Sequence, residues 1–456
     1  MSSNLFDVKE HIIPAQYVRE YPRATSHSQE ETLYLHIKQY RPLENLDPKP
    51  GDITLIGSHS NAFIKETLEP VWDDILERCK KNGVGIRSIW VADVANQGGS
   101  GVLNEQTLGD EPSWDDHARD LLHMINHCRS DIRRPLVGIG HSMGATHLVH
   151  LSAIHPRLLS GLILVEPIIH PAHSDPFSVS LNQACSHRTA YWPSRTAATA
   201  AIHKNPFYTQ WDRRVVNNWL KYCLRDTPSL LYPDGRLTDQ GEQPVVLTTP
   251  PLQEVAVYLR QNFHPEGHVD RTMHPDLDST HPEAYPFYRP EPPRHWTNSL
   301  PSLRPPTLYI LGSASPSSSV PGYRQELLAR TGSAVGGSGG LKLGKVAELV
   351  VPGTGHAVMM EEVAAVADGA VEWLSKVKRW YNAEEEDVEM KKWRAKSQVE
   401  KFTVSEEWKK QAIAEWGRRV KAGLQVDEEW RRMLGGQPFR GLEGITAEGV
   451  VIKSKL

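Results

Sequence analysis

The segment that most constrains the fold is residues 136–149, LVGIGHSMGATHLV. An apolar run of strand character, Leu136 to Ile139, meets Gly-x-Ser-x-Gly, and an apolar stretch able to form a helix follows at once. This context is typical of a nucleophile elbow, a sharp strand-to-helix turn that exposes a serine. We therefore predict that Ser142 is a nucleophile and that a Cβ on Gly140 or Gly144 would collide with neighbouring backbone. The alternative is a glycine-rich turn that carries an ordinary serine.

A nucleophilic serine needs a general base, and the best candidate is His356. An apolar strand predicted over residues 347–351 runs into a loop bracketed by Gly353 and Gly355, which presents His356 just before a helix-like segment. Most of the 21 histidines are expected at the surface or with satisfied hydrogen bonds. The pattern therefore assigns the base to His356.

The acid of the site is predicted from the lack of a carboxylate at the position where the acid usually lies. In enzymes with such an elbow it usually follows the strand before the histidine strand, but residues 312–317 contain neither Asp nor Glu, and the next carboxylate, Glu326, lies in a helix-like segment. One strand earlier, the apolar run 162–165 ends directly in Glu166. Glu166 is therefore the predicted acid, which would orient the imidazole and stabilise the imidazolium. The alternative is a surface acid at a strand end.

Apolar runs of strand length alternate along the chain with amphipathic segments of helix length. Strands are expected near residues 53–57, 87–93, 136–139, 162–165, 306–311 and 347–351, and helices near 68–80, 115–128 and 362–377. This alternation predicts an α/β fold with a mostly parallel central sheet covered by helices. In that architecture, the loop after the 53–57 strand and the residue after the nucleophile supply the oxyanion amides, here the backbone N–H groups of Asn61 and Met143. Residues 94–110 are expected as a loop near the mouth of the site.

Regularity breaks down between Glu166 and Pro306, which divides the chain into four parts. We predict a core formed by residues 1–167 and 306–378, a cap inserted at 168–305 after the sixth strand, and a charged helical tail at 379–456. Helices are expected in the cap at 196–204, 213–224 and 252–262, and a cap of this kind shapes an acyl pocket and excludes water.

The cap also holds basic and aromatic side chains with two interpretations each. The basic residues would contact coenzyme A phosphates or form a solvated face, and they are Arg188, Arg195, Lys204, Arg213, Arg214, Lys221 and Arg225. The aromatic residues would line the acyl pocket or form the cap's own small core, and they are Tyr191, Trp192, Phe207, Tyr208, Trp211 and Trp219.

Composition excludes several classes of protein. A net charge of −4 over 456 residues gives no electrostatic support for nucleic-acid binding. No apolar run approaches the roughly eighteen residues that a membrane span requires, and residues 1–20 lack the layout of a secretory signal. The four cysteines are widely spaced and form no metal-type pair, which favours a reducing compartment. We expect neither a cofactor nor a metal.

The last three residues of the sequence predict a compartment. Ser454, Lys455 and Leu456 form the tripeptide that addresses proteins to peroxisomes. The expected location is the peroxisome matrix, and the expected partner is the peroxisomal import receptor.

In this order, and with that tripeptide, Ser142, Glu166 and His356 resemble the fungal peroxisomal branch of the α/β-hydrolase superfamily. This branch includes hydrolases of toxin pathways and the acyl-CoA hydrolase of mycophenolic acid biosynthesis. The resemblance covers most of residues 8–374, and it is carried by the segments at 90–95, 114–122, 135–142 and 288–292.

The resemblance implies an α/β-hydrolase of fungal secondary metabolism that hydrolyses an acyl-CoA or ester and releases a carboxylic acid through a Ser-His-Glu triad. The mycophenolic branch has Asp at the acid position, where this chain has Glu166. A second hypothesis is an acyltransferase or cyclase that uses the same acyl-enzyme, and a third is a hydrolase-fold protein that only binds. The assembly is left open, with a homodimer among the alternatives.

Overall fold

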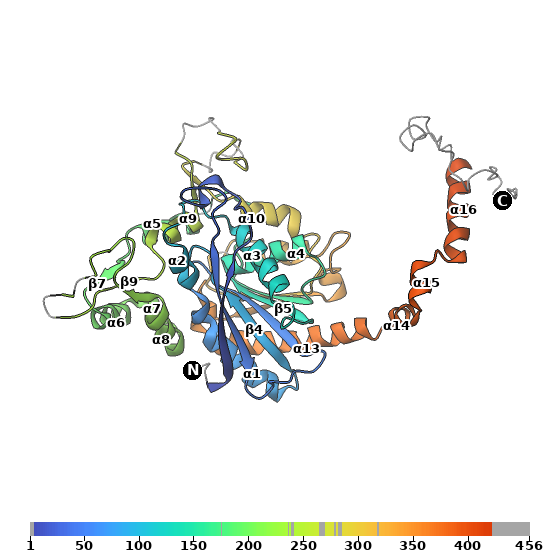
Figure 1. Ribbon diagram of the computed structural model, residues 1–456, viewed down its shortest axis with the longest axis horizontal. Coiled ribbons are helices and arrows are strands. Elements are labelled where there is room, and N and C mark those ends of the chain that lie inside the picture. The colour runs from blue at the N-terminus through green and yellow to red at the C-terminus, as the bar shows by residue number, and fades with distance from the viewer. Residues whose placement is uncertain are drawn as a thin grey trace. The chain divides into compact units, whose positions relative to one another are not determined.

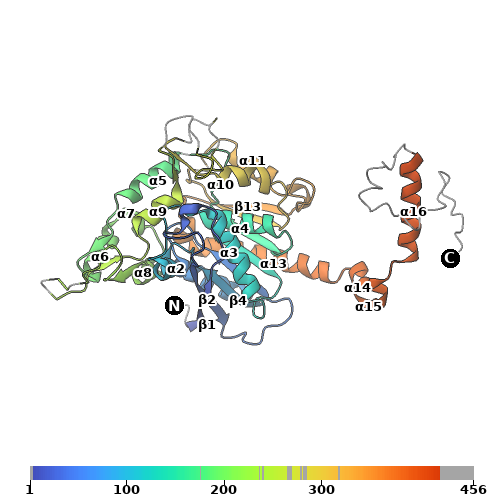
Figure 2. The ribbon, with the colours of Figure 1, turned by 45° about the horizontal axis from the view of Figure 1, so that its top comes forward.

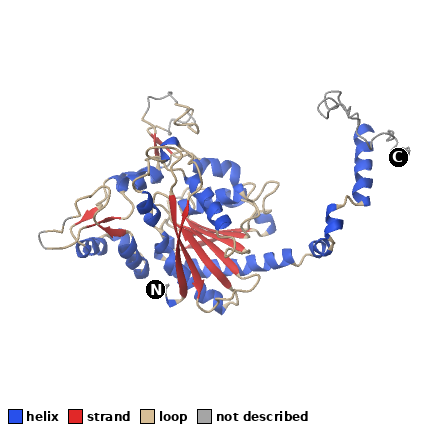
Figure 3. Cartoon of the chain, viewed as in Figure 1, coloured by secondary structure: helices blue, strands red, loops and turns tan. Residues whose placement is uncertain are grey.

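Eight strands form one twisted sheet at the centre of the computed structural model (Figure 1, Figure 3). Their order is β1-β2-β4-β3-β5-β6-β12-β13, and β2 alone runs in the direction opposite to the other seven strands. The expected mostly parallel sheet is therefore confirmed. The strands are β1 (Phe6–Pro14), β2 (Tyr34–Pro42), β3 (Ile53–Ser58), β4 (Ile86–Ala92), β5 (Leu136–His141), β6 (Gly161–Val165), β12 (Thr307–Gly312) and β13 (Val346–Val351).

The structure describes residues 4–421 except 175, 236, 239–240, 264–269, 278–279, 281–284 and 317–318. Within them, the central strands β3, β5, β6 and β12 are buried at every position, as expected for parallel strands covered on both faces. One face packs on α1 (Glu69–Lys81) and α13 (Val363–Glu385), and the other on α3 (Trp114–His127), α4 (Met143–Ile154) and α11 (Tyr323–Arg330).

A large insertion lies between β6 and β12, and its elements α5 to α9 group together on one side of the sheet (Figure 2). The expected cap after the sixth strand is present. It contains α5 (Pro176–Ser186), α6 (Arg195–Lys204), α7 (Pro206–Thr209), α8 (Arg213–Tyr222), α9 (Pro251–Tyr258), α10 (Glu291–Arg294), the three-stranded sheet β7 (Tyr191–Trp192), β9 (Val245–Leu247) and β8 (Leu224–Asp226), and the pair β10 (Arg260–Gln261) and β11 (Phe287–Tyr288).

Two expectations about local structure are wrong. The helix expected over 252–262 ends at Tyr258, because residues 260–261 pair with β11 instead. The loop expected over 94–110 contains α2 (Gly98–Asn104). Its glycines disfavour a helix, but tertiary hydrogen bonds hold the segment. The backbone N–H of His36 donates to Ser100 Oγ at 2.8 Å, and Asn104 Nδ2 donates to the carbonyl of Ala95 at 2.8 Å.

The chain divides into two compact units, Met1–Asn382 and Ala383–Leu456. The described part of the second unit contains α14 (Val388–Ala395), α15 (Gln398–Phe402) and α16 (Glu406–Lys421), and local ion pairs such as Lys392–Glu389 line these charged helices. Ser454, Lys455 and Leu456 lie outside the described residues. No helix among the described residues has the length and apolar character that a membrane crossing requires.

Candidate active site

The turn between β5 and α4 has the geometry of an elbow. Ser142 adopts φ 56° and ψ −120°, a backbone conformation that is strained for a residue with a side chain. Its N–H donates to the carbonyl of Val165 on the neighbouring strand β6 at 2.9 Å. A Cβ on Gly140 would lie 2.5 Å from the carbonyl oxygen of Gly144, and a Cβ on Gly144 would lie 2.2 Å from that of Ser58. The predicted need for both glycines is therefore confirmed.

We expect Gly144→Ala to destabilise the protein by about 3 kcal/mol, because overpacking against rigid backbone costs about 1–3 kcal/mol and a 2.2 Å contact lies at the severe end. Urea unfolding measures the change. Gly355→Ala is the matched control, because a Cβ there meets no atom within 4 Å. Equal stability of the two variants would contradict the close approach of α4 to β3.

The structure brings the three predicted site residues into one hydrogen-bonded chain. His356 Nε2 lies 2.9 Å from Ser142 Oγ, and His356 Nδ1 lies 3.2 Å from Glu166 Oε2. The Glu166 side chain is 1% exposed and that of His356 is 19% exposed. These distances suit a base that removes the serine proton while a buried carboxylate holds the opposite ring nitrogen.

Hydrogen-bond donors at the end of β12 and in the following loop hold the Glu166 carboxylate in place. Glu166 adopts φ 46° directly after β6. Its Oε1 accepts the N–H of Gly312 at 2.7 Å, and its Oε2 accepts the hydroxyl of Ser315 at 2.5 Å. Charge-assisted hydrogen bonds of this kind fix a carboxylate in place. Ser315, which is fully buried, was not predicted from the sequence. In this chain the end of β12 and the loop after it, where the acid usually lies, supply two hydrogen-bond donors instead. They bind an acid that follows the neighbouring strand β6.

His141, the residue before Ser142, was also missed. Its Nε2–H donates to the backbone carbonyl of His356 at 2.8 Å, which ties the base's loop to the elbow. Burial, together with the neighbouring His356 ring, lowers the pKa of His141 to about 3. His141 is therefore neutral at physiological pH and acts as a hydrogen-bond donor that positions His356.

Buried neutral histidines predict acid sensitivity. Burial also lowers the pKa values of His59, His117 and His147. Because the unfolded chain then binds more protons than the native state, the stability is fully present above pH ~6.5 and is lost as the pH falls toward the folded pKa, about 3 for His141. For His141, protonation of the unfolded chain is expected to cost about 2 kcal/mol of stability between pH 7 and pH 5, and the other three histidines add to the loss in the same direction.

Urea unfolding at pH 7, 6 and 5 measures this dependence. Among the described residues neither ring nitrogen of the buried His117 has a hydrogen-bond partner, so His117→Met is expected to flatten the pH dependence without losing a hydrogen bond. His155→Gln, at an exposed position, should leave the slope unchanged. A slope that is the same in His117→Met and in the intact protein would contradict a neutral buried His117.

The two predicted oxyanion donors lie on adjoining segments. Asn61 follows β3, and Met143 opens α4, which the end of β3 touches at Gly144. Among the described residues no acceptor pairs with the backbone N–H of Asn61 or Met143. The Asn61 side chain is held on both sides, since its Oδ1 accepts from Gln97 Nε2 and its Nδ2 donates to the carbonyl of Glu254 at 2.9 Å. The position of Asn61 is therefore fixed by its side chain.

The cap reaches the base directly. Phe177, on α5, lies in a T-shaped arrangement against His356 with ring centroids 5.2 Å apart. An apolar ring at this place limits the access of water to the imidazole.

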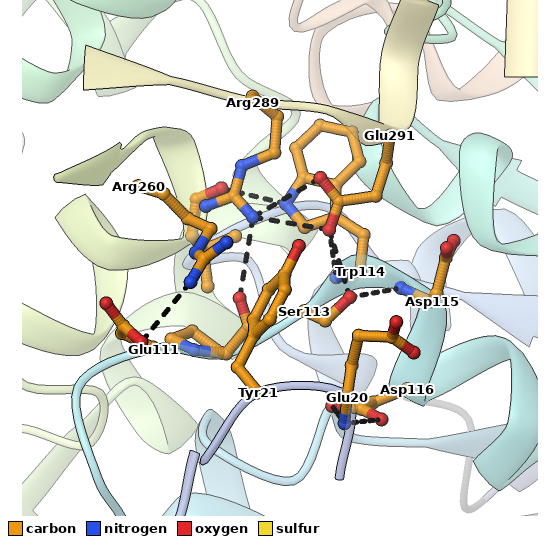
Figure 4. Close-up of polar contacts among 12 residues, drawn as sticks. Glu20, Tyr21, Glu111, Ser113, Trp114, Asp115, Asp116, Arg260, Arg289 and Glu291 are labelled. Atoms are coloured by element: carbon orange, nitrogen blue, oxygen red, sulfur yellow. Dashed lines mark hydrogen bonds and ion pairs between the residues drawn. The ribbon is translucent and has the colours of Figure 1, made fainter. Parts of the chain in front are cut away.

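A buried ion pair and a buried hydrogen bond connect the cap to the core (Figure 4). Arg260 Nη2 from the cap donates to Glu111 Oε2 of the core at 3.3 Å. Glu291, paired with Arg289 at 3.4 Å, accepts the backbone N–H of Trp114 at 3.0 Å. The side chains of the two arginines are at most 4% exposed. Because breaking one partner of a buried pair leaves an unpaired charge, these contacts hold the cap in one position.

The basic residues of the cap fall into two groups. Four are paired with acids, and they are Arg188 (Glu254), Arg195 (Asp226), Arg214 (Asp212 and Asp74) and Arg225 (Glu105). Lys204, Arg213 and Lys221 are exposed. The aromatic residues Trp192, Tyr208, Trp211 and Trp219 are buried in the apolar cluster that includes the cap helices. This burial favours the interpretation of a core within the cap.

One group among the described residues has the composition of a metal site. Asp115, His150 and His295 place their ligand atoms within 4.8 Å of one another. However, Asp115 Oδ1 already contacts His150 Nδ1 at 2.6 Å and His295 Nε2 at 2.9 Å, and its Oδ2 pairs with the cationic Arg294. Both oxygens of Asp115 are therefore already engaged by two imidazoles and a guanidinium, so this arrangement fits a hydrogen-bonded support between α3, α4 and α10.

Comparison with known proteins identifies relatives along the whole chain. Residues 71–369 match the alpha/beta hydrolase family. A type I acyl-CoA thioesterase of Penicillium roqueforti is 39% identical over 96% of this chain and 97% of its own length. An abhydrolase domain-containing protein of Alternaria alternata is 29% identical over 54% of this chain and 86% of its own. The crystal structure of a peroxisomal alpha-beta-hydrolase from Saccharomyces cerevisiae covers 93% of this chain with a TM-score of 0.60 at 16% identity.

Proposed function

This chain belongs to the alpha/beta hydrolase family and hydrolyses ester or thioester bonds, and we propose that it is an acyl-CoA thioesterase that releases a carboxylic acid of fungal secondary metabolism. The observation that carries the proposal is the unbroken chain of hydrogen bonds from Glu166 through His356 to Ser142. Support for the thioester comes from the 39% identity, over nearly the full length of both chains, to a protein named a type I acyl-CoA thioesterase.

The proposed reaction proceeds in two halves through an acyl-enzyme. Ser142 Oγ attacks the acyl carbonyl while His356 Nε2 removes its proton, and Glu166 holds Nδ1–H and stabilises the imidazolium. The carbonyl oxygen becomes an oxyanion that accepts hydrogen bonds from the backbone N–H groups of Asn61 and Met143. The tetrahedral intermediate collapses, coenzyme A leaves as the thiol with the proton from His356, and the acyl group stays on Ser142.

Water completes the reaction. His356 removes a proton from a water molecule that attacks the acyl ester, and the second oxyanion uses the same two amides. Its collapse returns the proton to Ser142 and releases the free acid. An amine or alcohol in place of this water would give acyl transfer, so the choice between hydrolysis and transfer depends on what the cap admits.

The test is release of free coenzyme A from a panel of acyl-CoAs, with the matching oxygen esters and with amine and alcohol acceptors in parallel. We expect thioester turnover to yield one free acid for each coenzyme A released. Turnover of oxygen esters alone would limit the function to an esterase. An acylated acceptor in place of the acid would identify a transferase. No release from any substrate by the folded protein would contradict the proposal.

The proposed location is the peroxisome matrix, reached through the import receptor that recognises Ser454, Lys455 and Leu456. The receptor reads such a tripeptide at a free carboxyl end. A fluorescent protein fused to the amino end of the chain should colocalise with a peroxisomal marker in a filamentous fungus, and removal of the three residues should leave it in the cytosol. Peroxisomal signal that survives the removal would assign import to another segment.

A further inference from the structure

A cleft opens between the core and the cap. It has a volume of about 400 Å³, and its walls come from residues 23–26, from α2 and residues 108–110, and from the cap strands β8 and β9 with the first turn of α9. Sites for small molecules usually have volumes of about 300–1,000 Å³. Ser142, Glu166 and His356 are all absent from the described residues that line this cleft. The cleft is therefore large enough for a ligand and does not include the triad.

Three exposed leucines converge on this cleft. Leu230, Leu231 and Leu252 line it and are 52%, 59% and 57% exposed. Leu230 and Leu231 stand in the turn after β8, and Leu252 stands in α9. Single exposed leucines are ordinary on a protein surface, but several gathered at one concavity mark a binding site.

The charges of the cleft are already neutralised by the protein. Its lining contains two arginines and two acids, and they pair with each other as Arg23 with Asp110 and Arg225 with Glu105. A phosphate or carboxylate ligand would have to compete with these carboxylates for the guanidinium groups. The lining therefore favours an uncharged ligand over the polyanionic coenzyme A.

The start of α9 forms one wall of this cleft and is hydrogen-bonded to the core. Gln253 lines the cleft, donates to the carbonyl of Gly109 at 2.8 Å and accepts from Asn96 Nδ2 at 3.0 Å. The carbonyl of the next residue, Glu254, accepts a hydrogen bond from the Asn61 side chain at 2.9 Å. Hydrogen bonds from Gln253 and Glu254 therefore hold this wall of the cleft against the core.

We propose that this cleft is a binding site for an uncharged, predominantly apolar small molecule, separate from the site at Ser142. The volume sets the size of the ligand, the three leucines supply the apolar contacts, and the pairing of both arginines with carboxylates disfavours an anion. Binding here does not depend on the activity proposed above, since no triad residue takes part.

Nile red, an uncharged apolar dye whose fluorescence rises in apolar surroundings, is a suitable probe for the full chain. We expect saturable binding of one dye at the cleft, weakened at least tenfold in the double variant Leu231→Asp/Leu252→Asp. The matched control is Leu341→Asp/Leu343→Asp, which places the same two charges at leucines that are 50% and 64% exposed and are not among the described residues that line the cleft. Circular dichroism checks that each variant is folded. Modification of Ser142 by a fluorophosphonate should leave the dye's affinity unchanged.

Three results would overturn the proposal. The first is the absence of saturable binding to the folded chain. The second is binding that the fluorophosphonate abolishes and the leucine changes do not affect, because the dye would then occupy the acyl pocket. The third is a dimer in sedimentation velocity that dissociates in Leu231→Asp/Leu252→Asp, because the leucines would then contact a second copy of the chain. The dye is read without turnover, so failure of the thioesterase proposal would leave this test intact.

Discussion

Ser142→Ala is expected to lower kcat/KM for thioester hydrolysis by about four to six orders of magnitude. Alanine removes the atom that forms the acyl-enzyme, while the oxyanion amides and the cap remain. The residual rate would then come from binding and the oxyanion donors alone. Initial rates of coenzyme A release, measured with intact protein and variant at equal concentrations, give the ratio directly.

The control for this variant is Ser152→Ala, on the same helix α4. Ser152 is buried, and its hydroxyl donates to the carbonyl of Leu148 at 2.9 Å. The change therefore removes a buried serine hydroxyl without touching the site, and activity should stay within a fewfold of the intact protein. A Ser142→Ala protein that is folded and still turns over at more than a hundredth of the normal rate would show that another group is the nucleophile.

Glu166→Gln is expected to lower kcat by about 10⁴-fold with the fold preserved. Three donors meet this side chain, from Gly312, Ser315 and His356. A glutamine has one oxygen to accept them, and its amide N–H₂ would face either a donor or the imidazole. His356 would then lose the partner that holds Nδ1–H and stabilises the positive ring in the transition state. Single-turnover acylation rates separate this loss in chemistry from a change in binding.

Two companion variants make the second prediction specific. Glu166→Asp keeps the charge, and Asp tolerates the positive φ of 46° better than most residues, so it should retain far more activity than Glu166→Gln. Ser315→Ala removes one donor but leaves the contact between Glu166 and His356, and about a tenfold loss is expected for one hydrogen bond to a charged group. Equal activity of Glu166→Gln and Glu166→Asp would indicate that the carboxylate charge is not used.

Local context made the elbow and the histidine loop predictable from sequence. The glycines around Ser142 are required by close contacts within one turn and with the adjacent strand. The sequence pattern that indicates the elbow is therefore short and can be recognised without the structure. Glu166 could be predicted because the usual place for the acid is empty in the sequence. The mostly parallel sheet followed from strands that are apolar at nearly every position.

The residues that hold the site residues in position could not be predicted from the sequence, because their roles depend on contacts between distant segments. Nothing in the sequence distinguishes Ser315 from Ser313, and only the packing of the loop after β12 under Glu166 does so. His141 occupies a variable position of the elbow pattern. Its ring nevertheless donates a hydrogen bond to the backbone carbonyl of His356, 215 positions later in the chain. In α2, tertiary hydrogen bonds outweigh the poor helix propensity of its glycines.

The most direct test of the proposed mechanism is the identity of the residue that carries the acyl group during turnover. The intact protein would be mixed with an isotopically labelled acyl-CoA from the active panel, quenched in acid within milliseconds and digested for peptide mass spectrometry. We predict one labelled acyl group on Ser142, formed at least as fast as kcat and absent from Ser142→Ala. Turnover at the normal rate with no acyl group on Ser142, or with the acyl group on another residue, would contradict the proposed mechanism.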